Sequence, residues 1–287
     1  MKKTTLKVVT VIALIITTGS IYIFNYVPPI PKQHGIIDTK LYLGNSKNQP
    51  LLVAFGGGDG GNDWTRNYLK TKRDSLIQKG YAVLAIGYFK SKGTPKNLDR
   101  ISLNAISDSI LKIVKHPKID ATKIALIGGS KGGELVLNLA SRFEYFKAVI
   151  ALSTSNVSFP AITWSSNTSS WYYNNKEVKY VPASLDIIGP ALKGDLHTAF
   201  SIMLENEEAA ENAEIIVENI NGPILVLSGK NDTQWPATIM SNRLIERLDE
   251  NNFKFYYEHL ALNGGHIEPL NQFNLVYEFL EKHFPVN

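Results

Sequence analysis

The stretch that decides the fold reads Lys123-Ile-Ala-Leu-Ile-Gly-Gly-Ser-Lys-Gly-Gly-Glu-Leu-Val-Leu-Asn-Leu-Ala-Ser141. Its residues from Ile124 to Ile127 are apolar and rich in β-branched side chains, which predicts a buried strand. The residues after Gly132 have the composition of a helix. Between them, Gly128-x-Ser130-x-Gly132 matches the G-x-S-x-G pattern of a nucleophile elbow. Because glycine leaves room for a sharp, strained turn, we predict that the Ser130 hydroxyl stands exposed at the end of the strand.

The predicted helix after Ser130 would aim its first N–H groups at the same point, where they can stabilise negative charge. The alternative is a glycine-rich turn in which Ser130 only caps the helix. The strand pattern before the serine and the helix pattern after it favour the elbow.

Apolar runs that predict buried strands recur along the chain and alternate with helical patterns. Strands are expected at 51–55, 81–87, 123–127, 148–152, 224–228 and 253–257, and helices at 67–79, 101–114, 133–141, 236–248 and 269–284. Continuous apolar strands that alternate with helices are typical of a parallel sheet covered on both faces. We therefore predict an α/β fold with a mostly parallel central sheet.

Residues 155–221 interrupt this alternation. They are rich in serine, asparagine, tryptophan and tyrosine, and they become acidic at 205–211. Because they follow a central strand, they are expected over the carboxyl ends of the strands, where open α/β sheets bind ligands. We predict a lid or substrate cap; the alternative is an irregular structural excursion.

Two residues downstream complete a candidate catalytic triad with Ser130. A serine hydroxyl needs a base to take its proton, and the base needs an acid to orient it. Asp232 follows one predicted strand, and His266 lies in a glycine-rich loop after the next. The chain order Ser, Asp, His is that of the α/β-hydrolases. We therefore predict an α/β-hydrolase fold with Ser130 as nucleophile, Asp232 as acid and His266 as base.

An oxyanion hole needs two backbone N–H donors near the nucleophile. One is expected from Lys131, directly after the serine, and the other from the glycine loop 56–61, where we choose Gly57 and Gly58. The same loop matches the G-x-G-x-x-G dinucleotide fingerprint. That interpretation is not favoured, because no acidic residue ends the next predicted strand to bind a ribose.

The composition excludes several classes of function. The chain has 287 residues, of which 44% are hydrophobic, so it can bury a sizeable core. It has no cysteine, which excludes disulfides, thiol catalysis and cysteine-based metal sites. The net charge is +4, but no basic stripe with interleaved aromatic residues is present. We expect no nucleic-acid partner, no metal and no other cofactor.

Residues 1–27 form a separate segment. Three lysines at positions 2, 3 and 7 precede an uncharged, mostly apolar run from Val8 to Val27. A run of this length can cross a hydrocarbon layer of about 30 Å. Positive charge on its N-terminal side predicts a single-pass membrane anchor with the rest of the chain outside the cytoplasm. The alternative is a signal peptide cleaved after Ser20, followed by secretion.

Pro28, Pro29 and Pro31 predict a stiff spacer after this segment. We place a linker at residues 28–45 and a catalytic domain at residues 46–287. The insertion of residues 155–221 lies inside that domain.

With these residues in place, the chain resembles the C-terminal catalytic domain of the acyl-CoA thioesterase and bile acid-CoA:amino acid N-acyltransferase family. The resemblance runs from about Pro50 to Pro269. It is carried by the motifs Phe55-Gly-Gly-Gly, Pro95-Lys-Asn-Leu-Asp, His116-Pro, Gly129-Ser-Lys-Gly-Gly-Glu, Ser170-Trp, Gly222-Pro-Ile-Leu, Asp232-x-x-Trp-Pro and Gly265-His-Ile-Glu-Pro. The Ser-Lys-Gly-Gly-Glu run is the most specific of these.

The resemblance implies Ser130, Asp232 and His266 as nucleophile, acid and base, and it suggests Trp171 and Trp235 as substrate contacts. It implies a small-molecule acyl thioester as substrate and an acyl-enzyme intermediate. Family members with serine at the nucleophile position tend to be thioesterases, whereas amidating members carry cysteine.

The chain departs from the family pattern in two ways. A short tether stands where the family usually has a β-sandwich domain, and Asp59 replaces an expected glycine in the loop. The open alternatives are a membrane-tethered carboxylesterase or lipase-like hydrolase of extracytoplasmic esters, an acyl-CoA:amino acid N-acyltransferase, and a non-catalytic binding module with the same fold.

Overall fold

The computed structural model describes residues 25–286 together with residues 7, 8, 10, 11, 14, 18, 19 and 22. Most of the predicted membrane segment therefore lies outside the described residues. None of the helices formed by the described residues has the length and apolar character needed to span a bilayer. Both the anchor and the cleaved signal peptide stay predictions.

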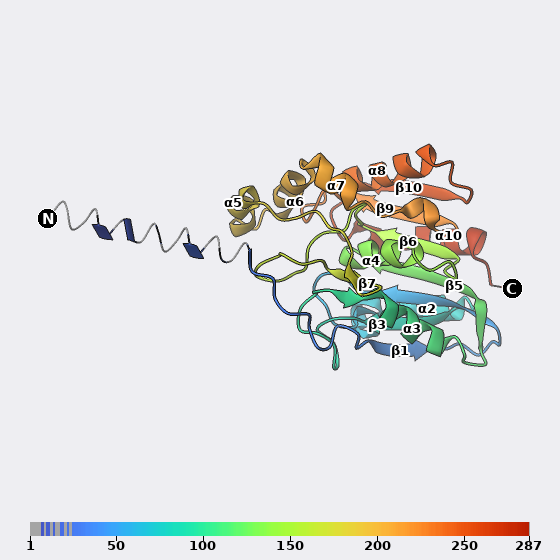
Figure 1. Cartoon of the computed structure of the whole chain (residues 1–287). Helices are drawn as coiled ribbons and strands as arrows, with labels where there is room; N and C mark the ends of the chain where they lie inside the picture. The colour runs from blue at the N-terminus through green and yellow to red at the C-terminus, as the bar shows by residue number, and fades with distance from the viewer. Residues whose placement is uncertain are drawn as a thin grey trace.

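A seven-stranded sheet forms the centre of the described part of the chain (Figure 1). Its strands are β1 (Asp38–Tyr42), β2 (Gln49–Phe55), β3 (Ala82–Gly87), β5 (Ile119–Gly129), β6 (Ala148–Leu152), β9 (Ile224–Gly229) and β10 (Tyr257–Leu262). Their spatial order is β1-β3-β2-β5-β6-β9-β10. All neighbours are parallel except β1, which pairs antiparallel with β3. The predicted mostly parallel sheet is confirmed.

Two boundaries predicted from the sequence are wrong. Strand β1 lies inside the range assigned to a linker at 28–45, and its residues are only partly buried. An edge strand with charged residues does not produce a continuous apolar run, so its pattern is weak. The last strand was expected at 253–257, but β10 begins at Tyr257, where its register with Ile224 of β9 starts.

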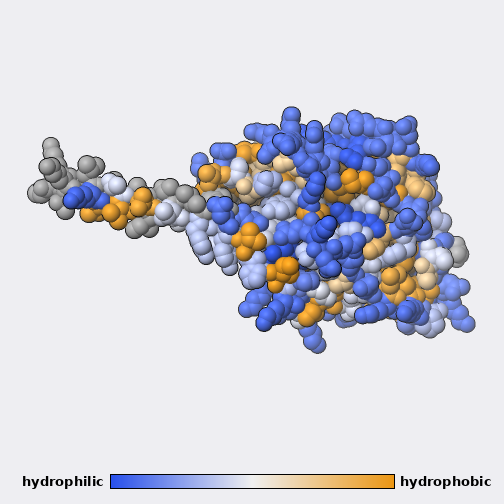
Figure 2. Space-filling view, in the orientation of Figure 1, coloured by the Kyte–Doolittle hydropathy of each residue, from blue (hydrophilic) through white to orange (hydrophobic). Residues whose placement is uncertain are grey.

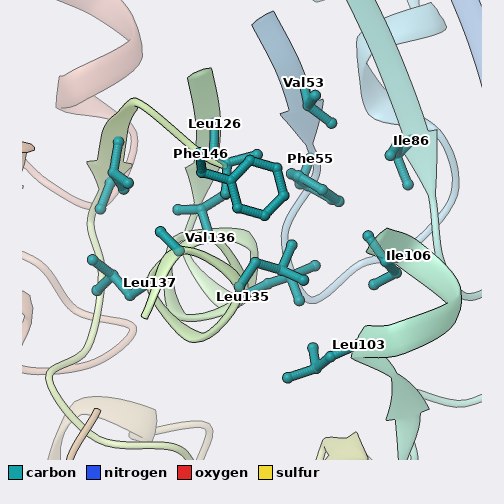
Figure 3. Close-up of a cluster of buried hydrophobic side chains, with 14 of the residues drawn as sticks. Val53, Phe55, Ile86, Leu103, Ile106, Leu126, Leu135, Val136, Leu137 and Phe146 are labelled. Carbon is teal, nitrogen blue, oxygen red and sulfur yellow. The ribbon is translucent and has the colours of Figure 1, made fainter. Parts of the chain in front are cut away.

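Helices cover both faces of the sheet. They are α2 (Lys70–Gln78), α3 (Leu103–Ile113), α4 (Lys131–Ala140), α8 (Ala237–Glu250), α9 (Glu268–Asn271) and α10 (Asn274–His283). One buried layer joins the sheet to α3, α4 and α8, and the other joins it to α2 and α10. Figure 3 shows side chains of β2, β3 and β5 meeting those of α3 and α4 in the first layer.

Strand β2 shows why its sequence is apolar without interruption. Val53 and Phe55 point into one layer, and Leu52 and Ala54 point into the other. Successive side chains of a strand face opposite sides, so burial on both sides needs apolar residues at every position.

The insertion after β6 holds the remaining regular elements. They are the short strands β7 (Trp171–Tyr173) and β8 (Lys176–Glu177) and the helices α5 (Ile188–Leu192), α6 (Leu196–Leu204) and α7 (Glu207–Asn212). Strand β7 also pairs with β4 (Ile101–Ser102). Four short 3-10 helices occur in the described residues, η1 (Asp63–Thr65), η2 (Asn67–Leu69), η3 (Leu185–Ile187) and η4 (Val217–Asn219). The insertion has its own small core, in which Val157, Phe159 and Met203 pack with Trp235 and with Met240 of α8.

A partly buried histidine makes the stability of the sheet edge depend on pH. His259 in β10 lies 2.8 Å from the Ser228 hydroxyl through Nε2 and 2.9 Å from the Asn242 amide oxygen through Nδ1. Burial lowers the pKa of this imidazole below its ordinary value of 6.5. The unfolded chain therefore binds a proton more readily, and the stabilisation present above pH 6.5 is lost as the pH falls below that value.

We predict that the free energy of unfolding falls between pH 7 and pH 5, and that His259→Gln makes this fall shallower. Urea unfolding followed by circular dichroism at several pH values measures both slopes. Equal slopes for the two proteins would contradict the assignment to His259.

Candidate active site

Ser130 occupies a strained turn between β5 and α4. Its backbone angles are φ 55° and ψ −124°, a region that residues other than glycine rarely adopt. The Ser130 N–H donates to the Leu152 carbonyl at 2.8 Å, and the Ser130 carbonyl accepts from Gly133 at 2.8 Å. The Ser130 side chain makes no capping hydrogen bond to α4. The strand–turn–helix context of the elbow is thus confirmed, and a serine that only caps the helix is contradicted.

Close backbone contacts explain the glycines of the elbow. A Cβ atom on Gly128 would overlap the carbonyl oxygen of Gly132, and a Cβ atom on Gly132 would overlap the carbonyl oxygen of Gly56. The elbow is therefore pressed against the loop that follows β2. Within that loop, a Cβ atom on Gly57 would lie 3.2 Å from the Cβ of Ser130. The glycine loop and the candidate nucleophile are direct neighbours.

Asp232 and His266 meet in the loops after β9 and β10. The Asp232 Oδ2 atom lies 2.7 Å from His266 Nδ1. The other oxygen of Asp232 accepts from the N–H groups of Gln234 at 2.8 Å and Trp235 at 3.3 Å. The Ser153 hydroxyl donates to the His266 carbonyl at 2.7 Å. Both partners of the Asp–His pair are therefore held in place.

One cavity of about 820 Å³ joins the predicted site residues. Ser130 and His266 line it together with Gly57, Gly58 and Lys131. Asp232 lies behind His266 and contacts it through Nδ1. The fold thus brings the three candidate triad residues and the candidate oxyanion residues to one place.

The rest of the cavity wall is mostly apolar and comes largely from the insertion. Its apolar residues from that part of the chain are Phe159, Pro160, Ala161, Ile162, Ala183, Ile187, Ala191, Leu196, Ala199, Phe200 and Met203. Sequence patterns did not single out these residues, because the insertion shows no clear periodicity. Trp235, which was predicted as a substrate contact, lines the cavity, and its contact with substrate stays a prediction.

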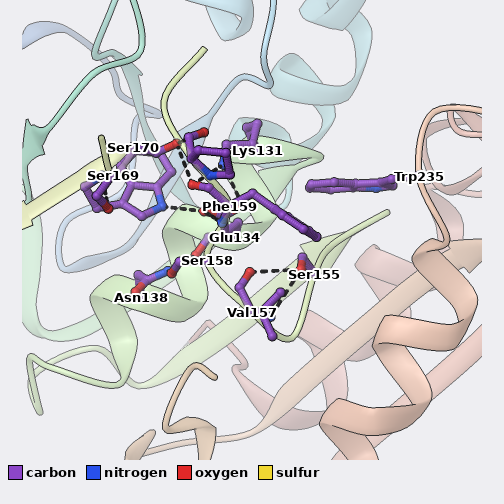
Figure 4. A network of polar contacts seen from close by, with 12 residues as sticks. Lys131, Glu134, Asn138, Ser155, Val157, Ser158, Phe159, Ser169, Ser170 and Trp235 are labelled. Carbon is purple, nitrogen blue, oxygen red and sulfur yellow. Dashed lines mark hydrogen bonds and ion pairs between the residues drawn. The ribbon is translucent and has the colours of Figure 1, made fainter. Parts of the chain in front are cut away.

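Trp171 has a different place from the one predicted. Its side chain is completely buried, it is not among the residues that line the cavity, and its indole N–H donates to Glu134 at 2.6 Å. The prediction of a substrate contact is therefore corrected: Trp171 donates to Glu134 and belongs to its polar network. Figure 4 shows Glu134 with Lys131 and Phe159 in this network.

The centre of that network is a buried ion pair between Lys131 and Glu134. The Lys131 ammonium lies 2.7 Å from one oxygen of Glu134. The other oxygen accepts from Trp171 and, at 3.2 Å, from the Phe159 N–H. Burial raises the pKa of Glu134 and lowers that of Lys131, and each charge opposes the shift of the other. The network ties the first turn of α4 to the insertion.

The glycine loop is held from its other side by groups that the sequence patterns did not indicate. The Tyr88 hydroxyl donates to the Gly56 carbonyl at 2.8 Å, and the Trp64 indole donates to the Phe55 carbonyl at 3.3 Å. Asp63 also lines the cavity. Burial raises the pKa of its carboxyl, and the charge of the nearby Arg66 guanidinium acts in the opposite direction.

The described residues contain no group of three or more histidine, aspartate or glutamate side chains arranged to hold a metal ion.

A model of the family described as "BAAT / Acyl-CoA thioester hydrolase C terminal" matches residues 102–270. This chain belongs to that family. The matched range includes the elbow, the Lys131–Glu134 pair, the insertion and both loops that carry Asp232 and His266.

Relatives of known name in this family are acyl-coenzyme A thioesterases. Acyl-coenzyme A thioesterase 5 of Mus musculus is 24% identical over 245 residues, which cover 84% of this chain and 54% of that protein. Acyl-coenzyme A thioesterase 6 of Mus musculus is 28% identical over 221 residues, covering 76% and 49%. This chain thus spans about half the length of these relatives.

Solved structures show the same fold at low sequence identity. The acylaminoacyl peptidase of Pyrococcus horikoshii has a TM-score of 0.61 and 18% identity, with 86% of this chain and 39% of that chain covered. The structure of DcsB with its substrate analogue has a TM-score of 0.58 and 17% identity, with 86% and 94% covered. The predicted α/β-hydrolase fold is confirmed.

The buried ion pair gives a testable prediction about stability. Glu134→Gln leaves the Lys131 ammonium buried without its counter-charge, which should cost about 3–5 kcal/mol of the free energy of unfolding. Adding Lys131→Met removes the unpaired charge, so the double variant should be more stable than Glu134→Gln alone. Urea unfolding measures both differences.

Glu281→Gln is the matched control, because it makes the same change in an exposed ion pair with Lys79 and should change stability little. A double variant as unstable as Glu134→Gln would show that the hydrogen bonds of Glu134, and not its charge, carry the effect.

Proposed function

We propose that this chain is a serine hydrolase that cleaves acyl thioesters of the acyl-CoA type through an acyl-enzyme on Ser130. The observation that carries this proposal is the shared cavity: Ser130 and His266 both line it, and His266 is oriented by Asp232 at 2.7 Å. Membership of the family supports the substrate class.

The proposed reaction uses each member of the triad once in each half-reaction. The Ser130 hydroxyl attacks the thioester carbonyl while His266 Nε2 takes its proton, and Asp232 stabilises the imidazolium through Nδ1. The tetrahedral intermediate expels the thiol, which receives the proton from His266. A water molecule then loses a proton to His266 and attacks the acyl-enzyme, and the second tetrahedral intermediate expels the Ser130 oxygen, which receives that proton from His266, and releases the acid.

The proposed oxyanion hole combines the N–H of Lys131 with an N–H of the glycine loop, from Gly57 or Gly58. The Lys131 N–H lies at the start of α4, where the helix dipole favours negative charge. Both glycines predicted for the second donor line the cavity, and a Cβ atom on Gly57 would lie 3.2 Å from the Cβ of Ser130. A Cβ atom on Gly58 would contact the Lys131 side chain at 3.6 Å, so this glycine also borders the site.

The shape and lining of the cavity support an acyl chain as the bound group. A volume of about 820 Å³ with a mostly apolar wall suits a ligand of substantial hydrocarbon content. The insertion supplies much of this wall, which supports its proposed role as a substrate cap over the site. The relatives are named as acyl-coenzyme A thioesterases, which supports coenzyme A as the thiol leaving group of the proposed substrate.

A carboxylesterase of an extracytoplasmic lipid or cell-envelope ester is the second candidate. Its support is the apolar run from Val8 to Val27, which predicts that the domain lies outside the cytoplasm, where acyl-CoA is scarce. Turnover of matched thioesters and oxoesters distinguishes the two: a preference for oxoesters of the same acyl chain would replace the thioesterase proposal.

Loss of the nucleophile tests the triad. Ser130→Ala should lower kcat by about a millionfold, and Asp232→Asn by about ten-thousandfold because the imidazole loses its orienting charge. Hydrolysis of a series of acyl-CoAs and oxoesters by the full chain measures both. Ser141→Ala, at the other end of α4, is the matched control and should keep wild-type turnover. Substantial turnover by Ser130→Ala with a native circular-dichroism spectrum would overturn the assignment.

The identity of the nucleophile should decide the fate of the acyl group. An oxoester on Ser130 reacts with water, whereas a thioester on a cysteine reacts more readily with amines. We therefore expect wild-type protein to release free acid, and Ser130→Cys to raise the ratio of amide to acid in the presence of glycine or taurine. Mass spectrometry of the products measures this ratio. Mostly amide from wild-type protein would favour an N-acyltransferase.

A further inference from the structure

Exposed apolar side chains gather around the mouth of the active-site cavity. We define the apolar rim as Ile162, Trp164, Ile188, Leu192 and Ile267, all of which are exposed. Leu192 is 83% exposed, and Ile267 and Trp164 are 65% and 63% exposed. Ile162 and Ile267 also line the cavity, so the rim is continuous with its interior.

Helix α5 is the most exposed part of this rim. None of its residues from Ile188 to Leu192 is buried, although its Ala191 lines the cavity. Figure 2 shows apolar surface at the end of the domain where the N-terminal segment joins it, and Figure 1 places α5 at that same end. Surface of this kind next to a binding site marks a docking surface.

The chain before the domain is fixed to this rim. The ring of Tyr26 stacks on Trp164 with 5.3 Å between the ring centres, and the Asn167 side chain donates to the Tyr26 carbonyl at 3.4 Å. The buried Arg100 guanidinium donates to the carbonyls of Pro28 at 2.8 Å and Pro29 at 3.0 Å. Pro28 and Pro29, two of the prolines predicted to form a stiff spacer, are thus hydrogen-bonded to the domain.

The contacts of Tyr26, Pro28 and Pro29 with the domain place the apolar rim next to the end of the N-terminal apolar run. The twenty uncharged residues from Val8 to Val27 end at Tyr26 and Val27, directly at Trp164. With Tyr26, Pro28 and Pro29 held on the domain, no slack chain separates the apolar run from the rim. Tyrosine and tryptophan at such a junction are typical of the membrane–water interface.

We propose that the apolar rim rests on a lipid bilayer, so that the cavity opens onto the membrane surface. If the proposed function holds, a long acyl chain passes from the bilayer to Ser130 along Ile162 and Ile267 without crossing water. Only this consequence rests on the proposed function; the membrane contact itself does not. The favoured substrates are then acyl thioesters or esters whose chain is held in a membrane.

Trp164 is a built-in probe for this contact. It is exposed, whereas the other three tryptophans, Trp64, Trp171 and Trp235, are at most 2% exposed. The full chain is reconstituted into vesicles of phosphatidylcholine and phosphatidylglycerol in equal parts, with or without brominated acyl chains. The Trp164 emission is the part of the wild-type emission that is lost in Trp164→Phe. We expect brominated lipid to quench this part.

Leu192→Asp should abolish most of this quenching, because it places a charge on the rim. Leu111→Asp is the matched control: Leu111 is also exposed but lies in α3 and outside the rim, and its quenching should stay as in wild-type protein. Circular dichroism verifies that both variants fold. Vesicle-bound protein without quenching of Trp164, or equal quenching in Leu192→Asp, would overturn the proposal. Loss of quenching together with self-association of the chain in sedimentation would assign the rim to a second copy instead.

Activity measurements separate this proposal from the proposed function. Leu192→Asp should lower turnover of a long-chain substrate held in vesicles and leave turnover of a short, water-soluble substrate unchanged. Hydrolysis of the soluble substrate without lipid quenching would overturn only the membrane contact. Lipid quenching without any hydrolysis would overturn only the proposed function.

Discussion

The close backbone packing around the elbow is the constraint on which the site depends. Three segments meet there, the end of β5, the first turn of α4 and the loop after β2, and side chains at Gly128 or Gly132 would overlap neighbouring carbonyl oxygens. This contact holds Ser130 at a positive φ and places it beside Gly57. The local strain at Ser130 is sustained because the surrounding backbone leaves the turn no other conformation.

The buried pair of Lys131 and Glu134 extends this constraint to the insertion. Lys131 follows the nucleophile, and Glu134 accepts hydrogen bonds from Phe159 and Trp171, which lie far along the chain. A buried ion pair is a weak source of stability by itself, but it requires its partners in one arrangement. The most specific motif of the sequence therefore connects the nucleophile to the wall of the cavity.

The apolar cavity, the apolar rim and the docked N-terminal segment all face the same side of the domain. All three lie at one end of the molecule, at the carboxyl ends of the parallel strands, and open α/β sheets bind their ligands at that edge. The relatives share only the domain, since the chain spans about half of their length. In this chain, the contacts of Tyr26, Pro28 and Pro29 with the domain place the end of the N-terminal run next to the rim.

The sequence by itself determined the central strands β2, β3, β5, β6 and β9, the elbow and the order of Ser130, Asp232 and His266. Continuous apolar runs and glycines at fixed spacing reflect local geometry, so these features could be predicted. Only the tertiary structure decided the contacts that join distant segments. It removed Trp171 from the cavity, assigned β1 to the sheet edge and docked the prolines on Arg100. These outcomes depend on packing between residues far apart in the chain, and such packing leaves no periodic pattern in the sequence.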